Sequence, residues 1–189
     1  MNTHRFGSDT VLYIFGGEKY DGADYTEQNY YNSYTETGSW INYYIPTSLT
    51  VVVVTNGDIP DYAFNGCRNI TRVELPQNAT RIGEMAFARC KQLTDIIIPS
   101  SVTTICRYAF SGCGNITSFE IPQGVTAIEE RAFSNCEKLT DINIPTSVTS
   151  IKGFAFSGCP LLTIRYKGTT IPASWDTNWN YDNNPVEFI

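Results

Sequence analysis

Histidine is almost absent from this chain of 189 residues, which has one, His4. A histidine-activated nucleophile or a histidine-rich metal site needs more than this single residue supplies. No run of 18 apolar residues occurs, so the sequence predicts no membrane-spanning helix. Basic side chains are outnumbered, since 13 Lys and Arg against 19 Asp and Glu give a net charge of −6. This balance disfavours general binding of nucleic acid or of anionic membranes.

Signals of processing and of phosphate binding are missing as well. The first seven residues lack the apolar stretch and the small-residue cleavage site of a secretory signal. We therefore expect either a protein that stays inside the cell or a chain whose signal was removed or lies upstream. The glycines of the chain form no phosphate-binding loop.

What the sequence does contain is a repeat of 23 residues. The phrase Ala-Phe-x-x-Cys occurs five times at this period, from Ala63 to Cys159. A fixed period is typical of a solenoid, in which each unit buries its apolar face only against its neighbours. We expect the repeated aromatic and thiol side chains to form two core columns: Phe64, Phe87, Phe110, Phe133 and Phe156, and Cys67, Cys90, Cys113, Cys136 and Cys159.

Residues 93–116 serve to predict one coil. The spacing of Ile96 and Ile98 indicates a short strand with both side chains inward, and Pro99 ends it because proline cannot donate to a ladder. The segment 102–105 crosses the back, and 107–112 is expected to form about one helical turn before a left-handed exit at Gly112. Equivalent pairs along the chain predict six parallel strands about 4.8 Å apart.

The two ends of the solenoid need covers, because a bare coil exposes core and strand edges. We assign residues 1–44, with eight tyrosines between Tyr13 and Tyr44, to an N-terminal cap. Residues 45–166 are assigned to the solenoid, and residues 167–189, with two tryptophans, to a C-terminal cap.

The unit Cys-x-x-Leu-x-x-Ile-x-Ile-Pro-x-x-Val-x-x-Ile-x-x-x-Ala-Phe-x-x-Cys resembles the BspA-like leucine-rich repeats, a 23-residue class of bacterial and protozoan surface proteins. The resemblance covers residues 45–166 and extends to 43–49 and 172–180. It implies an α/β, right-handed leucine-rich-repeat solenoid with a parallel β-sheet on one face and short helical turns and strands on the other. It further implies surface display or secretion, and adhesion to host proteins such as fibronectin or fibrinogen. The family has no shared catalytic residues, and its binding residues form no motif, so no individual site carries over.

The cysteine column favours buried thiols over disulfides or a metal site. Each coil contributes one thiol pointing the same way, whereas metal ligands come in close or facing sets, so we expect no metal and no cofactor. Parallel Cβ vectors also disfavour bridges between neighbouring coils. Cys106 lies outside the column. Because its equivalents are Gly83, Glu129 and Lys152, we expect it to face solvent.

The outward side chains of the strands are the predicted binding surface. Neighbouring coils place them in a grid of about 4.8 Å by 7 Å, broad enough for a protein partner. Acidic groups dominate this face, which favours a basic partner segment. The residues are Val51, Val53, Arg72, Glu74, Asp95, Ile97, Ser118, Glu120, Asp141 and Asn143. Beside them runs a threonine column that we expect to hydrogen-bond along the sheet: Thr50, Thr71, Thr94, Thr117 and Thr140.

Three classes of function stay open on the sequence. The first is a non-enzymatic surface or secreted module that binds a partner protein through the sheet face or the caps, with the tyrosine-rich leader as the rival patch. The second is a structural spacer or assembly domain of a larger surface protein without a specific ligand. The third is an enzyme with paired carboxylates, for which Asp176 and Asp182 are the best pair. We expect no catalysis, and the oligomeric state is not predicted.

Overall fold

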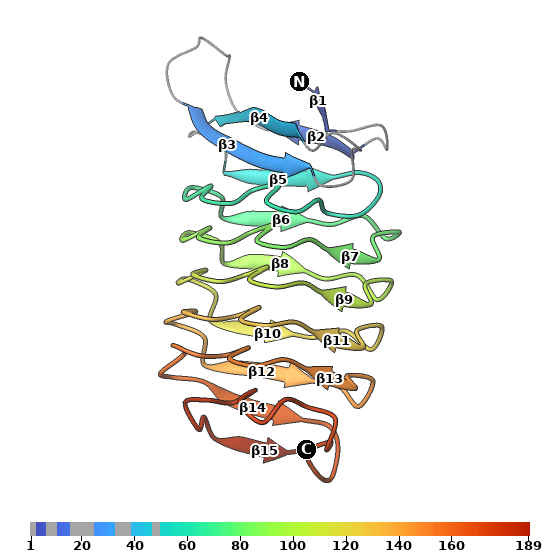
Figure 1. Ribbon diagram of the computed structural model, residues 1–189, viewed down its shortest axis with the longest axis vertical. Helices are drawn as coiled ribbons and strands as arrows, with labels where there is room; N and C mark the ends of the chain where they lie inside the picture. Colours follow the sequence, from blue (N-terminus) through green and yellow to red (C-terminus); the bar gives the residue numbers. More distant parts are fainter. Residues whose placement is uncertain (1–2, 7–10, 16–24, 33–38, 47–49) are drawn as a thin grey trace.

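The structure, a computed structural model, describes residues 3–6, 11–15, 25–32, 39–46 and 50–189, with side chains from Thr50 onward. From residue 50 the chain winds into coils stacked along one axis, with β5 near one end and β15 at the other (Figure 1). Each coil contributes one strand to a parallel sheet that we call the front sheet. Most coils also contribute a shorter strand to a second sheet, which we call the back sheet. The predicted solenoid is therefore confirmed.

Parallel strands form the front sheet. The six predicted strands are all found, and one more, β15 (Val186–Phe188), lies parallel to β14. The six are β5 (Val51–Val54), β6 (Arg72–Glu74), β8 (Asp95–Ile97), β10 (Ser118–Glu120), β12 (Asp141–Ile144) and β14 (Thr163–Tyr166). Pairing runs from β5 to β8 and again from β10 to β15, but β8 and β10 are not paired with each other.

A second parallel sheet lies on the other side of the coils. It consists of two-residue strands in the unbroken order β13–β11–β9–β7. The strands are β7 (Arg81–Ile82), β9 (Thr104–Ile105), β11 (Ala127–Ile128) and β13 (Ser150–Ile151). They confirm that segment 102–105 forms part of the back of the solenoid. Because β9 and β11 are paired, the stack is continuous here although the front sheet is interrupted.

The expected helical turn at 107–112 is not found. In its place are tight turns, in which the amides of Ala109, Ser111 and Cys113 each donate to the carbonyl three residues earlier. The alternate amides, of Tyr108, Phe110 and Gly112, donate to the next coil at 2.8–3.1 Å. A helix is excluded because Tyr108 and Gly112 have positive φ values of 56° and 74°. The left-handed exit predicted at Gly112 is confirmed.

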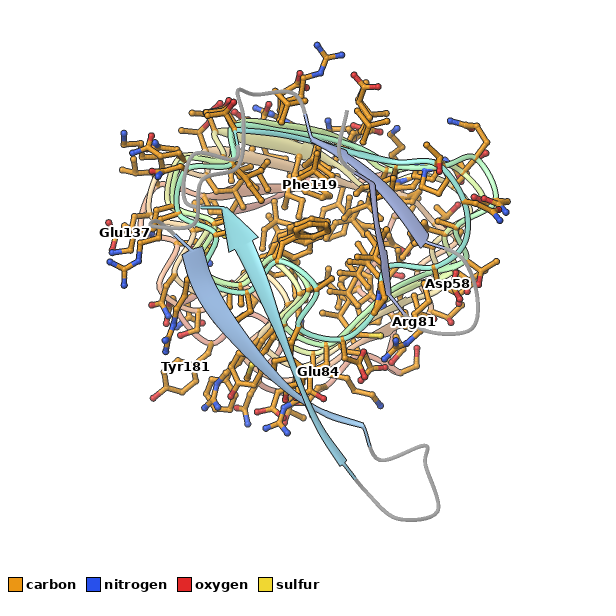
Figure 2. The ribbon with its side chains drawn as sticks, turned by 90° about the horizontal axis from the view of Figure 1, so that it is seen from above. Asp58, Arg81, Glu84, Phe119, Glu137 and Tyr181 are labelled. Carbon is orange, nitrogen blue, oxygen red and sulfur yellow. The ribbon has the colours of Figure 1, made fainter. Side chains whose placement is uncertain are left out.

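The core is built from the two predicted columns. The five repeated phenylalanines are at most 1% exposed, and their rings stack from coil to coil with centroids 5.4–5.8 Å apart. Phe119 is a sixth ring, contributed by β10 where other strands carry Val or Ile, and it packs against Phe110 and Phe133. Figure 2 shows Phe119 in the interior of the coil. Ile96, predicted to be fully inward, is only partly buried.

The cysteine column has a hydrogen-bonding role in addition to the predicted packing role. The thiols of Cys90, Cys113, Cys136 and Cys159 each donate to the carbonyl of a core phenylalanine in the preceding coil at 3.1–3.3 Å. Burial raises the pKa of Cys113 to about 12. Burial also raises the pKa of Cys90, so the thiols of Cys90 and Cys113 are neutral donors in the folded protein at ordinary pH.

Cys106 does not face solvent, which corrects the prediction from its position in the repeat. Cys106 is only 8% exposed, and the neighbouring guanidinium of Arg81 hydrogen-bonds to its thiol. Arg81 is itself paired with Asp61 at 2.6 Å. The repeat spacing did not show that Arg81, from the preceding coil, lies against this thiol.

Backbone pairing extends the front sheet beyond β5 at the N-terminal end. There β2 (Val11–Phe15) pairs antiparallel with β5, and β1 (Thr3–Phe6) pairs with β2. A separate hairpin of β3 (Tyr25–Asn32) and β4 (Ser39–Pro46) lies at the same end (Figure 1). The side chains of the tyrosine-rich leader lie outside the described residues, so its role as cap or binding patch stays a prediction.

At the C-terminal end, two tryptophans close the core. Trp179 packs edge-on against Phe156 at 6.1 Å, and Trp175 contacts both Trp179 and Tyr166. The Trp175 indole also donates to a backbone carbonyl at 3.2 Å. By contrast Tyr181 and Phe188 are 59% and 51% exposed. The tryptophans therefore seal the last coil, whereas these two rings face solvent.

Candidate protein-recognition surface

All ten side chains predicted for the sheet face lie on the outer side of the front sheet. Six are exposed, all in β6, β8 and β10. The other four, in β5 and β12, are half-buried, among them Val51 and Val53. The two valines are thus less available than the sequence suggested. Ile97 is 75% exposed and is the most exposed large apolar side chain among the described residues.

The carboxylates of this face are paired with cations of the same face. Arg72 contacts Glu74 at 2.8 Å and Asp95 at 3.5 Å, both within the β5–β8 part of the sheet. In the other part, Arg165 pairs with Asp141 and, at 3.1 Å, with Glu187. The acidic surplus expected from the sequence is consequently smaller than the residue types implied.

Three residues of this network were missed by the sequence analysis. Arg165 and Glu187 lie in β14 and β15, and Lys167 follows β14 and reaches Glu120 at 3.1 Å across two coils. Arg165 could have been found, because it stands between the inward Ile164 and Tyr166. Glu187 could not, because β15 belongs to a segment outside the repeat.

Hydrogen bonds and nearby cations act together on Asp141. The hydroxyl of Thr140 donates to this carboxylate at 2.7 Å, and the guanidinium of Arg165 lies against it. The Thr140 hydrogen bond first, and then Arg165, hold the pKa of Asp141 below its ordinary value. This carboxylate therefore stays charged at mildly acidic pH.

The threonine column beside the strands behaves as predicted except at one step. Hydroxyls donate to the threonine carbonyl one coil earlier from Thr71, Thr94 and Thr140, at 3.0–3.2 Å. Their amides bond in the same direction. Thr117 makes neither bond to Thr94. This missing step coincides with the interruption between β8 and β10, the strands that carry Ile97 and Phe119.

A second surface feature was not anticipated and lies opposite the front sheet. We call it the aromatic ridge, and it is formed by the residue before each Ala-Phe pair and by one residue of the C-terminal segment: Tyr62, Met85, Tyr108, Arg131, Phe154 and Tyr181. The first five have φ values of 51–60°, a left-handed conformation that costs side chains other than glycine about 1 kcal/mol or more. Figure 2 places Tyr181 and Glu84 on this side.

Contacts along the ridge offset this backbone cost. The Arg131 guanidinium lies 5.7 Å from the Tyr108 ring and 5.1 Å from the Phe154 ring, and it donates to the Tyr108 hydroxyl at 2.6 Å. Phe154 in turn contacts Tyr181 at 4.9 Å. The rings of Tyr108 and Phe154 thus have neighbours within the ridge, and we interpret this part of the ridge as a stabilising stack between coils.

The described residues offer little support for a catalytic or metal site. Asp176 and Asp182 each accept a backbone amide, from Asn178 at 2.8 Å and from Gly158 at 2.5 Å. Asp176 is thus used in a local turn, and Asp182 in a contact between the C-terminal segment and the last coil. No group of three or more potential ligands that could hold a metal ion occurs in the part of the chain with described side chains. Nor does that part include a helix long and apolar enough to cross a membrane.

Comparison with known families settles the class of the repeat. The model of the BspA-type leucine-rich repeat region matches residues 57–175 in six copies. The chain belongs to this family. Six copies exceed the five Ala-Phe-x-x-Cys phrases by one.

Solved structures of bacterial leucine-rich repeat proteins share the fold. A leucine-rich cell surface protein of Faecalibacterium prausnitzii A2-165 is 31% identical, with a TM-score of 0.64 over 85% of this chain and 39% of that one. A T. pallidum leucine-rich repeat protein is 24% identical, with a TM-score of 0.56 over 74% of this chain and 68% of that one. The pneumococcal vaccine antigen PcpA is 21% identical, with a TM-score of 0.56 over 71% and 42%.

The coverage and identity of these matches limit which properties of the relatives can be inferred for this chain. This chain spans less than half of the F. prausnitzii protein, and the other two likenesses concern the fold alone. No curated protein matches the chain.

Proposed function

We propose that the chain is a non-enzymatic recognition domain of a cell-surface or secreted protein, and that it binds a partner protein through the outer face of the front sheet. The observation that carries the proposal is the 75% exposure of Ile97, which lies half-way along the stack of front strands. An apolar side chain surrounded by polar groups is how the centre of a protein interface is built.

Rigidity of the scaffold supports the same proposal. The phenylalanine stack and the back sheet fix the coils, so the outward residues keep their spacing without a partner. A preorganised surface loses less conformational entropy on binding. The F. prausnitzii relative is described as a cell surface protein, which supports surface display or secretion for this chain. Host matrix and plasma proteins, fibronectin and fibrinogen among them, are the partners to test first.

A structural spacer is the second candidate, and the ion-pair network favours it. Arg72 and Arg165 each satisfy two carboxylates of the face, so much of its charge is used within the domain. A face whose charges are mutually paired has less to offer a charged ligand.

A titration separates the two. The purified chain is titrated against immobilised fibronectin and fibrinogen beside a variant with Arg72→Ala, Asp95→Ala, Ile97→Ala and Glu120→Ala. A matched control changes the opposite side, with Glu84→Ala, Arg107→Ala, Lys152→Ala and Tyr181→Ala. Saturable binding lost only by the sheet variant supports recognition through the front sheet. Loss only in the control moves the site to the other side, and absence of binding to a wider panel of surface proteins favours the spacer.

A further inference from the structure

Ile97 stands in a row of outward side chains that runs along the solenoid axis. The strand register pairs Val53 with Glu74 and Glu74 with Ile97, and beyond the interruption Glu120 pairs with Asn143. Ile97 therefore lies between two glutamates of neighbouring coils. Asp95, two residues earlier on the same strand, is a third exposed carboxylate. An apolar group thus has acidic neighbours along the axis and on its own strand.

The interruption of the sheet coincides with a second isoleucine that is less covered than its equivalents. At this step, where β8 and β10 are unpaired, Ile96 is only partly buried, whereas Val73 and Ile142 are 2% and 0% exposed. Phe119, larger than the Val or Ile of other coils, fills the core behind this position. On β8, the inward Ile96 and the outward Ile97 are therefore both less covered than the equivalent residues of β5, β6, β10, β12 and β14.

Spacing along the row decides which kind of partner element fits. Paired strands repeat at about 4.8 Å along the axis, and the pairing of β9 with β11 keeps the coils of Ile97 and Glu120 adjacent although β8 and β10 are unpaired. Residues three and four apart in an α-helix are about 4.5 and 6 Å apart along the helix axis. Alternate residues of an extended strand are about 6.6 Å apart, so a strand laid along the axis loses register after one step. A helix lying along the axis can match Glu74, Ile97 and Glu120 with residues on one of its faces.

The existing ion pairs of the two glutamates do not oppose such a partner. Glu74 is paired with Arg72, and Glu120 with Lys167, but these carboxylate side chains are 48% and 57% exposed. Exposed pairs contribute little, because water and salt screen them. Partner cations can therefore replace or share these contacts at small cost.

We infer that the element recognised by the front sheet is a basic amphipathic helix lying along the solenoid axis. One apolar side chain of the helix sits on Ile97, and Lys or Arg residues three or four positions before and after it reach Glu74 and Glu120. The inference rests on the proposed function and specifies its site and the chemistry of the partner.

A synthetic peptide provides the probe. It carries Lys-Ala-Ala-Leu-Ala-Ala-Ala-Lys between alanine- and glutamine-rich helical turns and a fluorescent label. The first control has the same composition with Leu moved by two positions, so that it leaves the face of the lysines. The second has prolines that keep the chain extended. Binding to the whole protein is measured by fluorescence anisotropy at low ionic strength.

Two protein variants accompany the peptides. Ile97→Ser removes the apolar centre, and Leu161→Ser is the matched control, since Leu161 is 59% exposed on the turn before β14. Thermal melts establish first that both variants fold. We expect saturable binding of the phased peptide, weakened about tenfold or more by Ile97→Ser and unchanged by Leu161→Ser.

Other results overturn the inference. These are no binding, equal binding of the permuted peptide, tighter binding of the extended peptide, or indifference to Ile97→Ser. Failure here with success in the matrix-protein titration rejects the helix and keeps recognition through the sheet. Failure in both rejects the proposed function as well.

Discussion

The thiol of Cys113 donates a hydrogen bond to the carbonyl of Phe87, 3.1 Å away in the preceding coil. That carbonyl already accepts the amide of Cys90 at 3.1 Å, so the thiol meets its second acceptor position. The same contact recurs in the neighbouring coils, and it explains why cysteine recurs at this position. Alanine would pack there but would leave the carbonyl with one partner fewer.

Removing this thiol is expected to weaken the fold. Cys113→Ala deletes a buried sulfur and a buried donor, which together should lower the free energy of unfolding by about 1–3 kcal/mol. Cys113→Ser keeps a donor but is smaller and more polar, so it tests the two contributions separately. Urea denaturation measures both. An unchanged urea midpoint for Cys113→Ala would show that this hydrogen bond does not stabilise the fold.

Alkaline pH should destabilise the protein through the same column. Burial raises the pKa of Cys113 to about 12, above its value in the unfolded chain near 9. A raised pKa in the folded state gives stability that is complete below pH 9 and is lost as the pH rises toward 12. For this thiol the loss should be about 1.4 kcal/mol by pH 10. Denaturation at pH 8 and pH 10 checks the sign, and Cys113→Ala should show a smaller loss.

The central ring of the phenylalanine stack provides the test of the core. Phe110 is fully buried and contacts Phe87, Phe119 and Phe133. Phe110→Ala should lower the free energy of unfolding by about 3–5 kcal/mol. A melting temperature equal to that of the parent protein would contradict the inward assignment of this column.

The aromatic ridge predicts an unusual response to glycine. Arg131 and Arg89 both have positive φ, 55° and 62°, so glycine relieves backbone strain at either position. Arg131 alone is held between two rings. Arg131→Gly should therefore lower the melting temperature, whereas Arg89→Gly should raise it or leave it unchanged. If both variants melt higher, the stack does not stabilise the coils.

Phe119 is expected to cause the interruption of the front sheet. Phe119→Ile installs the residue type found at the equivalent position in β12, and β8 and β10 should then pair. Hydrogen exchange measures this, since the amides of residues 95–97 and 117–120 should exchange more slowly in the variant if a ladder forms. Unaltered or faster exchange of these amides would show that the size of the Phe119 side chain does not cause the interruption.

The repeat was sufficient to predict the coil and its core. Period and apolar spacing predicted the strand positions, the phenylalanine stack and the outward direction of Arg72, Ile97 and Glu120, because neighbouring coils place equivalent residues alike. Contacts made by residues that differ from their equivalents in the other coils could not be predicted in this way. The contact of Arg81 with Cys106 and the partial exposure of Ile96 depend on individual side chains. The left-handed φ at Tyr108 and its equivalents recurs in every coil, but apolar spacing does not specify turn geometry.

Position 97 on the front sheet can carry a fluorescent reporter of binding. The six native cysteines are all buried. Ile97→Cys and Leu161→Cys therefore each introduce an accessible thiol that can be labelled with an environment-sensitive fluorophore. Each labelled variant is then titrated with soluble fibronectin or fibrinogen. Recognition through the front sheet predicts a saturable change of emission from the label at position 97 and none from the label at position 161. A saturable change at 161 with none at 97 would contradict it.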